Sequence, residues 1–189
     1  MEPILVSTGV VALAEIGDKT QLLAIVLAAK FRKPLPIILG ILAATLLNHV
    51  GAAAFGYFVA RLLTGAAFQA GVGAAFLLMA AWALVPDKED AGAAGRSHGG
   101  VFLTTLCAFF LVEMGDKTQI ATSLLAARFN DITWITVGTT LGMMIANVPA
   151  VLLGEAITRV LPLRYVRIAA AAIFAALGGW MVVGAVAGV

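Results

Sequence analysis

The sequence contains very few charged residues and almost no cysteine. Only 12% of its 189 residues are charged, and the net charge of +2 is too small to indicate a nucleic-acid partner. Soluble domains are about one-quarter charged, so a chain this poor in charge is not expected to fold in water. The single cysteine, Cys107, has no second cysteine to pair with, which excludes a disulfide framework and a thiolate metal site.

Apolar residues dominate the composition instead. They make up 62% of the chain, and the mean hydropathy is +1.05. A helix needs about 20 apolar residues to cross a hydrocarbon core of roughly 30 Å. Six stretches are long enough, at approximately residues 4–29, 36–60, 66–86, 101–127, 133–158 and 166–188. The sequence therefore predicts an all-α integral membrane protein with six transmembrane helices and no soluble domain. Since no basic region precedes the first stretch, we expect no cleaved signal peptide.

The basic residues of the loops are divided unequally between the two sides of the predicted membrane. One side carries Lys30, Arg32, Lys33, Lys88, Arg96, Arg159, Arg164 and Arg167. The other side carries only Arg61 and Arg128. Because cytoplasmic loops of membrane proteins hold the excess of lysine and arginine, this distribution predicts that both termini lie on the non-cytoplasmic side.

The two halves of the chain repeat one another. A shift of 98 residues aligns EIGDKTQ at 15–21 with EMGDKTQ at 113–119, and the alignment needs no gap. We expect a three-helix repeat over residues 1–86, a cytoplasmic linker over 87–99 and a second three-helix repeat over 100–189. An odd number of helices makes the second copy enter the membrane from the opposite side. Such inverted repeats are typical of secondary transporters, whose substrate site lies between the repeats near the bilayer midplane.

Both copies of the motif place polar side chains deep in the predicted membrane. Glu15 and Glu113 fall within one helical turn of its centre, where a charged residue costs on the order of 2.5–3.5 kcal/mol. In each copy the two acids and the glutamine are three residues apart, so they follow one stripe of an ideal helix. We predict that these two stripes hold a metal ion, through Glu15, Asp18, Gln21, Glu113, Asp116 and Gln119.

The other motif residues are predicted to support this site. Gly17, like its counterpart Gly115, allows another helix to approach closely or allows a local break that frees backbone carbonyls. On an ideal helix Thr20 would point away from the stripe, so its involvement requires such a break or a bound water. Thr118 holds the same place in the second copy. Lys19 and Lys117 each offset the negative charge of one of the two acids in their own copy.

The motif charges match a divalent cation. With all groups ionised, the four acids and two lysines carry a net charge of −2. Oxygen ligands, without cysteine and with at most one histidine nearby, favour Mn²⁺, Ca²⁺ or Mg²⁺ over Zn²⁺ or Cu⁺. Once the ion leaves, four crowded buried carboxylates cannot all stay ionised, and protons are the natural replacement. The sequence therefore predicts a cation/proton antiporter that needs no prosthetic group.

Several polar residues outside the motifs are secondary candidates. Asn48 and His49 lie in the middle of one predicted helix, and Asn147 aligns with His49 in the second repeat. They could line the cavity as supporting partners or weak ligands, or form interhelical hydrogen bonds. Glu155 breaks the repeat symmetry, and a pair with Arg159, four residues on, is favoured over a role as a gate.

Two other functions are compatible with parts of the pattern. Acid–lysine pairs could merely hold helices together, in which case the chain would be a structural membrane subunit; one pair would suffice for that, and the motif occurs twice. Asp18 and Asp116 could instead flank a water in an intramembrane aspartyl protease. Such a protease needs little beyond the two aspartates, so the additional glutamate, lysine and glutamine in each copy argue against it.

The duplicated Glu-x-Gly-Asp-Lys-Thr motif, at 15–20 and 113–118, resembles the Gdt-type family of small membrane cation transporters. This family includes the Golgi calcium/manganese proton antiporters of eukaryotes and the manganese exporters of bacteria. The resemblance covers almost the whole chain and implies export of Mn²⁺, with Ca²⁺ as an alternative, through a site built by both motifs. The short linker resembles that of bacterial inner-membrane members. The expected partners are the lipid bilayer, the divalent cation and H⁺, and a homodimer is left open.

Overall fold

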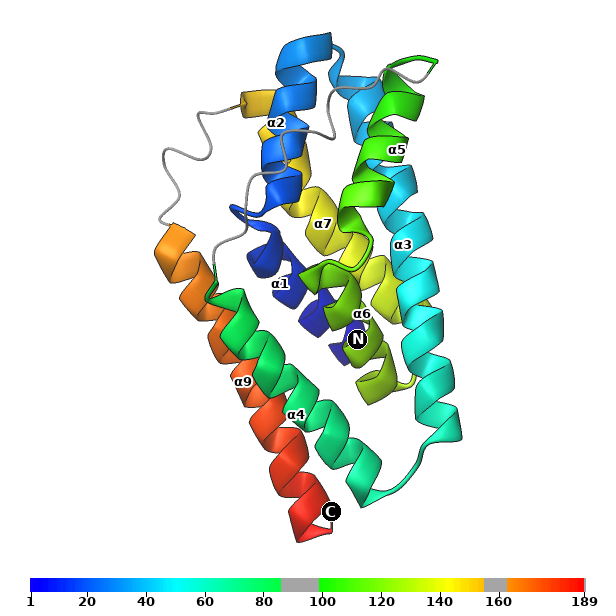
Figure 1. Ribbon diagram of the computed structural model, residues 1–189, viewed down its shortest axis with the longest axis vertical. Coiled ribbons are helices and arrows are strands. Elements are labelled where there is room, and N and C mark those ends of the chain that lie inside the picture. Colours follow the sequence, from blue (N-terminus) through cyan, green and yellow to red (C-terminus); the bar gives the residue numbers. More distant parts are fainter. Residues whose placement is uncertain (86–98, 155–162, 189) are drawn as a thin grey trace.

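The computed structural model describes residues 1–85, 99–154 and 163–188, and these residues form helices and short connections without a strand (Figure 1). The predicted all-α class is thereby confirmed. The helices are α1 (Glu2–Glu15), α2 (Lys19–Phe31), α3 (Pro34–Leu62), α4 (Ala66–Ala83), α5 (Val101–Glu113), α6 (Lys117–Phe129), α7 (Thr133–Leu153) and α9 (Leu163–Ala187).

The helix expected through each motif is interrupted there, which is one of the two options that the motif glycine left open. The first predicted span, 4–29, is divided into α1 and α2, and the fourth, 101–127, is divided into α5 and α6. Gly17 and Gly115 have φ angles of 80° and 78°, in the left-handed region that glycine adopts without steric cost. The residues before them, Ile16 and Met114, are extended, with ψ angles of 114° and 117°. The chain therefore leaves the helix after the glutamate and begins a new one at the aspartate.

Four of the described helices are long and apolar enough to cross a membrane. They are α3, α4, α7 and α9, and each falls on one of the predicted spans. A proline occupies the first turn of α3, where its missing N–H costs no hydrogen bond. Residues 86–98 and 155–162 lie outside the described part of the chain. The predicted linker, apart from Gly99, and the proposed pair of Glu155 and Arg159 therefore lie outside it as well.

Each half of the chain packs a long helix against the broken helix of the other half. In Figure 1, α3 runs beside α5 and α6, while α7 runs beside α1 and α2. The close contacts are repeat-related. A Cβ atom at Gly40 would lie 2.9 Å from the carbonyl oxygen of Phe102, and one at Gly138 would lie 2.8 Å from that of Ile4. Gly138 is the repeat counterpart of Gly40, and Phe102 is the counterpart of Ile4, each 98 residues later in the chain. The same glycine contact is therefore made twice, once by each half.

The helices α4 and α9 pack against each other along their length and form a separate arm of the molecule (Figure 1). A Cβ atom at Gly73 would lie 2.9 Å from the carbonyl oxygen of Gly178, so the two backbones approach closely. Phe76 and Phe174 stack with ring centroids 6.3 Å apart. These two phenylalanines are also 98 residues apart, and each lies against its own counterpart.

Candidate metal centre

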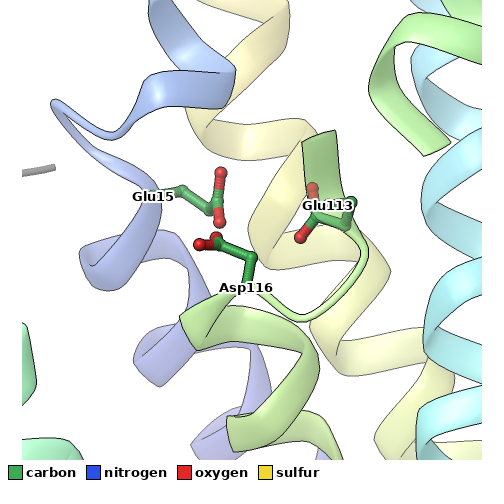
Figure 2. Close-up of side chains that lie close together, drawn as sticks. All are labelled: Glu15, Glu113 and Asp116. Carbon is green, nitrogen blue, oxygen red and sulfur yellow. The ribbon is translucent and has the colours of Figure 1, made fainter. Parts of the chain in front are cut away.

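Three carboxylates from the two motifs converge where the broken helices meet. Glu15, Glu113 and Asp116 each offer an oxygen atom, and these atoms all lie within 4.8 Å of one another. The three side chains are almost completely buried, at 0%, 1% and 3% exposed. Figure 2 shows them pointing toward one another from the end of α1, the end of α5 and the start of α6. Residues 98 positions apart are thus brought into a single group.

The local structure of the motif explains how both glutamates reach the centre. Glu15 is the last residue of α1, and its carbonyl oxygen accepts a hydrogen bond from the Asp18 N–H at 3.0 Å. Glu113 ends α5 and accepts the equivalent bond from Asp116, also at 3.0 Å. Both aspartates are the N-cap residues of the following helices, with ψ angles of 168°. Identical sequence therefore produces the same tight connection twice.

One oxygen of each glutamate is held by a threonine of the same motif. The Thr20 hydroxyl donates to Glu15 Oε2, and the Thr118 hydroxyl donates to Glu113 Oε1 at 2.5 Å. The sequence left a role for threonine conditional on unwinding of the helix, and the breaks at the two glycines supply that unwinding. The hydroxyls fix the orientation of the carboxylates and leave their second oxygens directed elsewhere.

The second oxygens have no hydrogen-bond donor within the described part of the chain. These buried atoms are Glu15 Oε1, Glu113 Oε2 and Asp116 Oδ2. Buried polar atoms are almost always hydrogen-bonded, and a buried charge must be paired or must coordinate a metal. Carboxylate oxygens are the ligands that hard divalent cations prefer, so this group of three could hold such an ion.

The two lysines of the motifs do not have the same surroundings. Lys19 Nζ lies 3.1 Å from Asp116 Oδ1, so the first motif supplies a positive charge to an acid of the second. Lys117 Nζ instead donates to the carbonyl oxygen of Val85 at 3.0 Å and lies 5.8 Å from the centre of the Trp82 ring. The net charge of the three carboxylates and Lys19, when all are ionised, is −2.

Asp18 does not belong to the group of three carboxylates, although we predicted it as a ligand of the same ion. It is buried at the start of α2 and lines a small cavity of about 20 Å³ together with Lys117 and Arg167. Its backbone conformation matches that of Asp116, so the difference lies in what surrounds the side chain and not in the local fold.

The two glutamines stabilise the helix breaks. Gln21 Oε1 accepts a hydrogen bond from the Gly17 N–H at 2.9 Å, and Gln119 Oε1 accepts one from the Gly115 N–H at 2.6 Å. Gln21 also donates through Nε2 to the carbonyl oxygen of Ala146 at 3.1 Å, which ties α2 to α7. A glutamine three residues after an N-cap aspartate is a variant of the capping box, and this spacing could have indicated the structural role from the sequence.

Three further predicted residues lie beside the carboxylates or on the helices that flank them. Asn48 donates through Nδ2 to the Phe110 carbonyl oxygen at 3.2 Å, joining α3 to α5. His49 is fully buried, with Nε2 3.9 Å from Glu113 Oε1. Asn147 is also fully buried and donates through Nδ2 to the Met143 carbonyl oxygen at 3.1 Å. Helices α3 and α7 thus each carry a fully buried polar side chain at the same position of the repeat, His49 and Asn147.

Comparison with known families identifies the kind of protein that carries this arrangement. The family model described as "Divalent cation/proton antiporter GDT1" matches residues 3–91 and 101–188, which is nearly the whole chain. The chain belongs to this GDT1 family. The resemblance inferred from the duplicated motif is therefore confirmed, and transmembrane ion transport by antiport is the activity that the family's name describes.

A bacterial relative supports the same conclusion. A protein of Vibrio cholerae serotype O1 (strain ATCC 39541 / Classical Ogawa 395 / O395), named "Putative manganese exporter", is 49% identical over 175 residues. The match covers 92% of this chain and 87% of the relative. No solved structure matches the chain. The protease alternative gains no support, because the GDT1 family is one of transporters and because Asp18 is not grouped with Asp116.

Proposed function

We propose that this protein exports Mn²⁺ from the cytoplasm in exchange for protons, through a site formed by Glu15, Glu113 and Asp116. The observation that carries the proposal is the convergence of three buried carboxylate oxygens, from both motifs, within 4.8 Å of one another. Ca²⁺ is the alternative substrate. The preference for Mn²⁺ rests on the name of the Vibrio cholerae relative, because oxygen ligands alone suit both ions.

The charge of the site supports a divalent substrate. Three carboxylates and the ammonium group of Lys19 leave two negative charges when all are ionised, and one divalent cation neutralises them. A buried charge is otherwise costly, because the surrounding apolar residues cannot replace its hydration. Asp18 is proposed to act outside the ion's ligand set, in the cavity that it shares with Lys117 and Arg167.

Proton exchange follows from the crowding of the acids. When the cation leaves, three carboxylates remain in a small buried volume and repel one another. Protons remove this repulsion without needing further ligands, and renewed cation binding displaces them. An inward proton gradient would therefore drive the cation outward.

The proposed topology has six membrane crossings in two inverted three-helix repeats. In this arrangement α1 and α2 together make the first crossing, and α5 with α6 make the fourth. Broken helices near the midplane are tolerated where they are buried in protein, and transporters use them to build ion sites. We propose further that the protein lies in a bacterial inner membrane with both termini on the non-cytoplasmic side.

The test is metal flux into proteoliposomes that contain the purified protein, with Mn²⁺, Ca²⁺ and Mg²⁺ compared and the internal pH recorded. We expect Mn²⁺ uptake accompanied by proton movement in the opposite direction. Glu15→Gln and Asp116→Asn are each expected to abolish it. Glu2→Gln is the matched control, since Glu2 is an exposed acid at the start of the same helix as Glu15. The proposal is wrong if the wild type moves no divalent ion, or if both site variants retain full flux.

A further inference from the structure

His49 is buried beside Glu113, and no hydrogen bond from the described residues holds its ring. It lies in the middle of α3 and is 0% exposed, and neither ring nitrogen has a hydrogen-bond partner within the described residues. A buried imidazole normally has at least one such partner. Its Nε2 lies 3.9 Å from Glu113 Oε1, which is too long for a hydrogen bond.

This distance suits two ligands of one ion. Nitrogen and oxygen ligands lie about 2.0–2.2 Å from a small divalent cation. Two atoms bound to the same ion are therefore up to about 4.4 Å apart, when they face each other across it. His49 Nε2 and Glu113 Oε1, at 3.9 Å, fall within this limit. A cation between them would give the His49 nitrogen a partner and would share Glu113 Oε1 with the Thr118 hydroxyl, which already donates to it.

The repeat makes His49 an asymmetric feature of the centre. A shift of 98 residues takes it to Asn147 in α7, which is also fully buried. The side chain of Asn147 uses Nδ2 to bond Met143, while its Oδ1 has no hydrogen bond within the described residues. The same position therefore offers an imidazole nitrogen in one half and an amide oxygen in the other.

We propose that His49 Nε2 is a ligand of the transported cation and that this nitrogen makes the site prefer Mn²⁺ over Ca²⁺ and Mg²⁺. This inference rests on the proposed function and assigns the residue responsible for its selectivity. Ca²⁺ and Mg²⁺ bind oxygen ligands almost exclusively. Transition metals accept imidazole readily, so replacing one oxygen by one nitrogen favours Mn²⁺ over both. A site built from the two motifs alone would lack this discrimination.

The first experiment detects the nitrogen directly. Electron spin echo envelope modulation of bound Mn²⁺ reports ¹⁴N nuclei in its coordination sphere. The chain contains only two histidines, His49 and His98, so His98→Asn leaves His49 as the sole imidazole. The affinity tag must be free of histidine. We expect His98→Asn to show the modulation of one imidazole. Absence of this signal in Mn²⁺-loaded protein would overturn the inference, whether or not variants of His49 fold.

The second experiment measures selectivity. His49→Asn places in the first half the residue that already occupies the equivalent position of the second half, so the packed volume changes little. We expect the ratio of Mn²⁺ to Ca²⁺ affinity to fall at least about tenfold, the lower end of what changes around metal ligands cost. Thr45→Val is the matched control, because Thr45 is buried one turn earlier on α3. It is expected to retain both the ratio and the ¹⁴N signal. An unchanged ratio in His49→Asn would contradict the inference.

Failure of this inference can be distinguished from failure of the proposed function. If Mn²⁺ binds, and Glu15→Gln removes it, but no imidazole modulation is seen, the carboxylate site stands and His49 is not a ligand. If Mn²⁺ does not bind to the wild type at all, the carboxylate site itself is wrong and the assignment of His49 falls with it.

Discussion

Lys19 of the first motif lies 3.1 Å from Asp116 of the second, whereas Lys117 donates a hydrogen bond to the Val85 carbonyl oxygen. Two copies of one sequence block are thus placed in a shared centre with unequal partners. Four predictions follow from this asymmetry and from the packing around it.

Removal of the lysine charge is expected to act differently in the two motifs. Lys19→Gln removes the positive charge beside the carboxylate group and with it the repulsion between that charge and the bound cation. Two unit charges 4 Å apart interact by about 1 kcal/mol even in water, and Mn²⁺ carries two charges. The substitution should therefore increase the affinity for Mn²⁺ about tenfold or more. Lys117→Gln should change the affinity much less. Calorimetric titration of the purified protein with Mn²⁺ measures both. Equal effects of the two substitutions would contradict the asymmetry.

Neutralisation of the two aspartates is also expected to have unequal effects. Asp116→Asn removes a member of the carboxylate group and should weaken Mn²⁺ binding by about 10–100-fold, comparable to changes around metal ligands elsewhere. Asp18→Asn should alter the affinity less, because Asp18 is not in that group. The two affinities can be compared by equilibrium binding, with free Mn²⁺ measured by its electron paramagnetic resonance signal. A larger loss for Asp18→Asn would show that the group of three is not the binding site.

The break before α6 is expected to require glycine for its backbone conformation alone. A Cβ atom at Gly115 would meet nothing within 4 Å, but its φ of 78° lies in the left-handed region. Gly115→Ala should therefore destabilise the protein by about 1–2 kcal/mol. Gly71→Ala is the control, since it also meets nothing within 4 Å but lies inside α4, where alanine favours the helix. Unfolding in detergent should give opposite shifts of the midpoint temperature.

The contact between α3 and α6 is expected to require glycine for space. A Cβ atom at Gly56 would lie 2.7 Å from the carbonyl carbon and 2.9 Å from the Cα atom of Ser123, which are backbone atoms that cannot rotate away. Gly56→Ala should separate the two helices and cost about 1–3 kcal/mol. Gly51→Ala, on the same helix but with nothing within 4 Å, should not destabilise the protein. Similar midpoint temperatures for the two variants would argue against this packing.

The sequence was sufficient to predict the class of the fold and to single out the two polar motifs whose acids lie together, because both depend on local patterns. Long apolar stretches indicate helices, and a polar block repeated within them indicates a buried site. The break of the helix at Gly17 was anticipated only as one option, since glycine permits both a close contact and a left-handed conformation. The capping role of Gln21 was missed, although the spacing from Asp18 contained the signal.

The unequal environments of the motifs could not be predicted from the motifs themselves. Asp18 and Asp116 have the same neighbours in sequence and nearly the same backbone angles. Which of them joins the glutamates depends on tertiary surroundings, such as the Val85 carbonyl oxygen that engages Lys117. Nothing in a seven-residue pattern encodes a contact with a residue more than thirty positions away. One polar difference between the halves was visible in the sequence, with His49 in the first half at the position of Asn147 in the second.

The exchanged glycine contacts, Gly40 with the second half and Gly138 with the first, resemble those across the axis of a dimer whose two subunits have been joined into one polypeptide. A symmetric dimer must carry the same residue on both sides of its axis, so any substitution is made twice. Fusion into a single chain removes that restriction. One half can then carry an imidazole at His49 while the other carries an amide at Asn147. The centre is therefore asymmetric in a way that two identical subunits could not be.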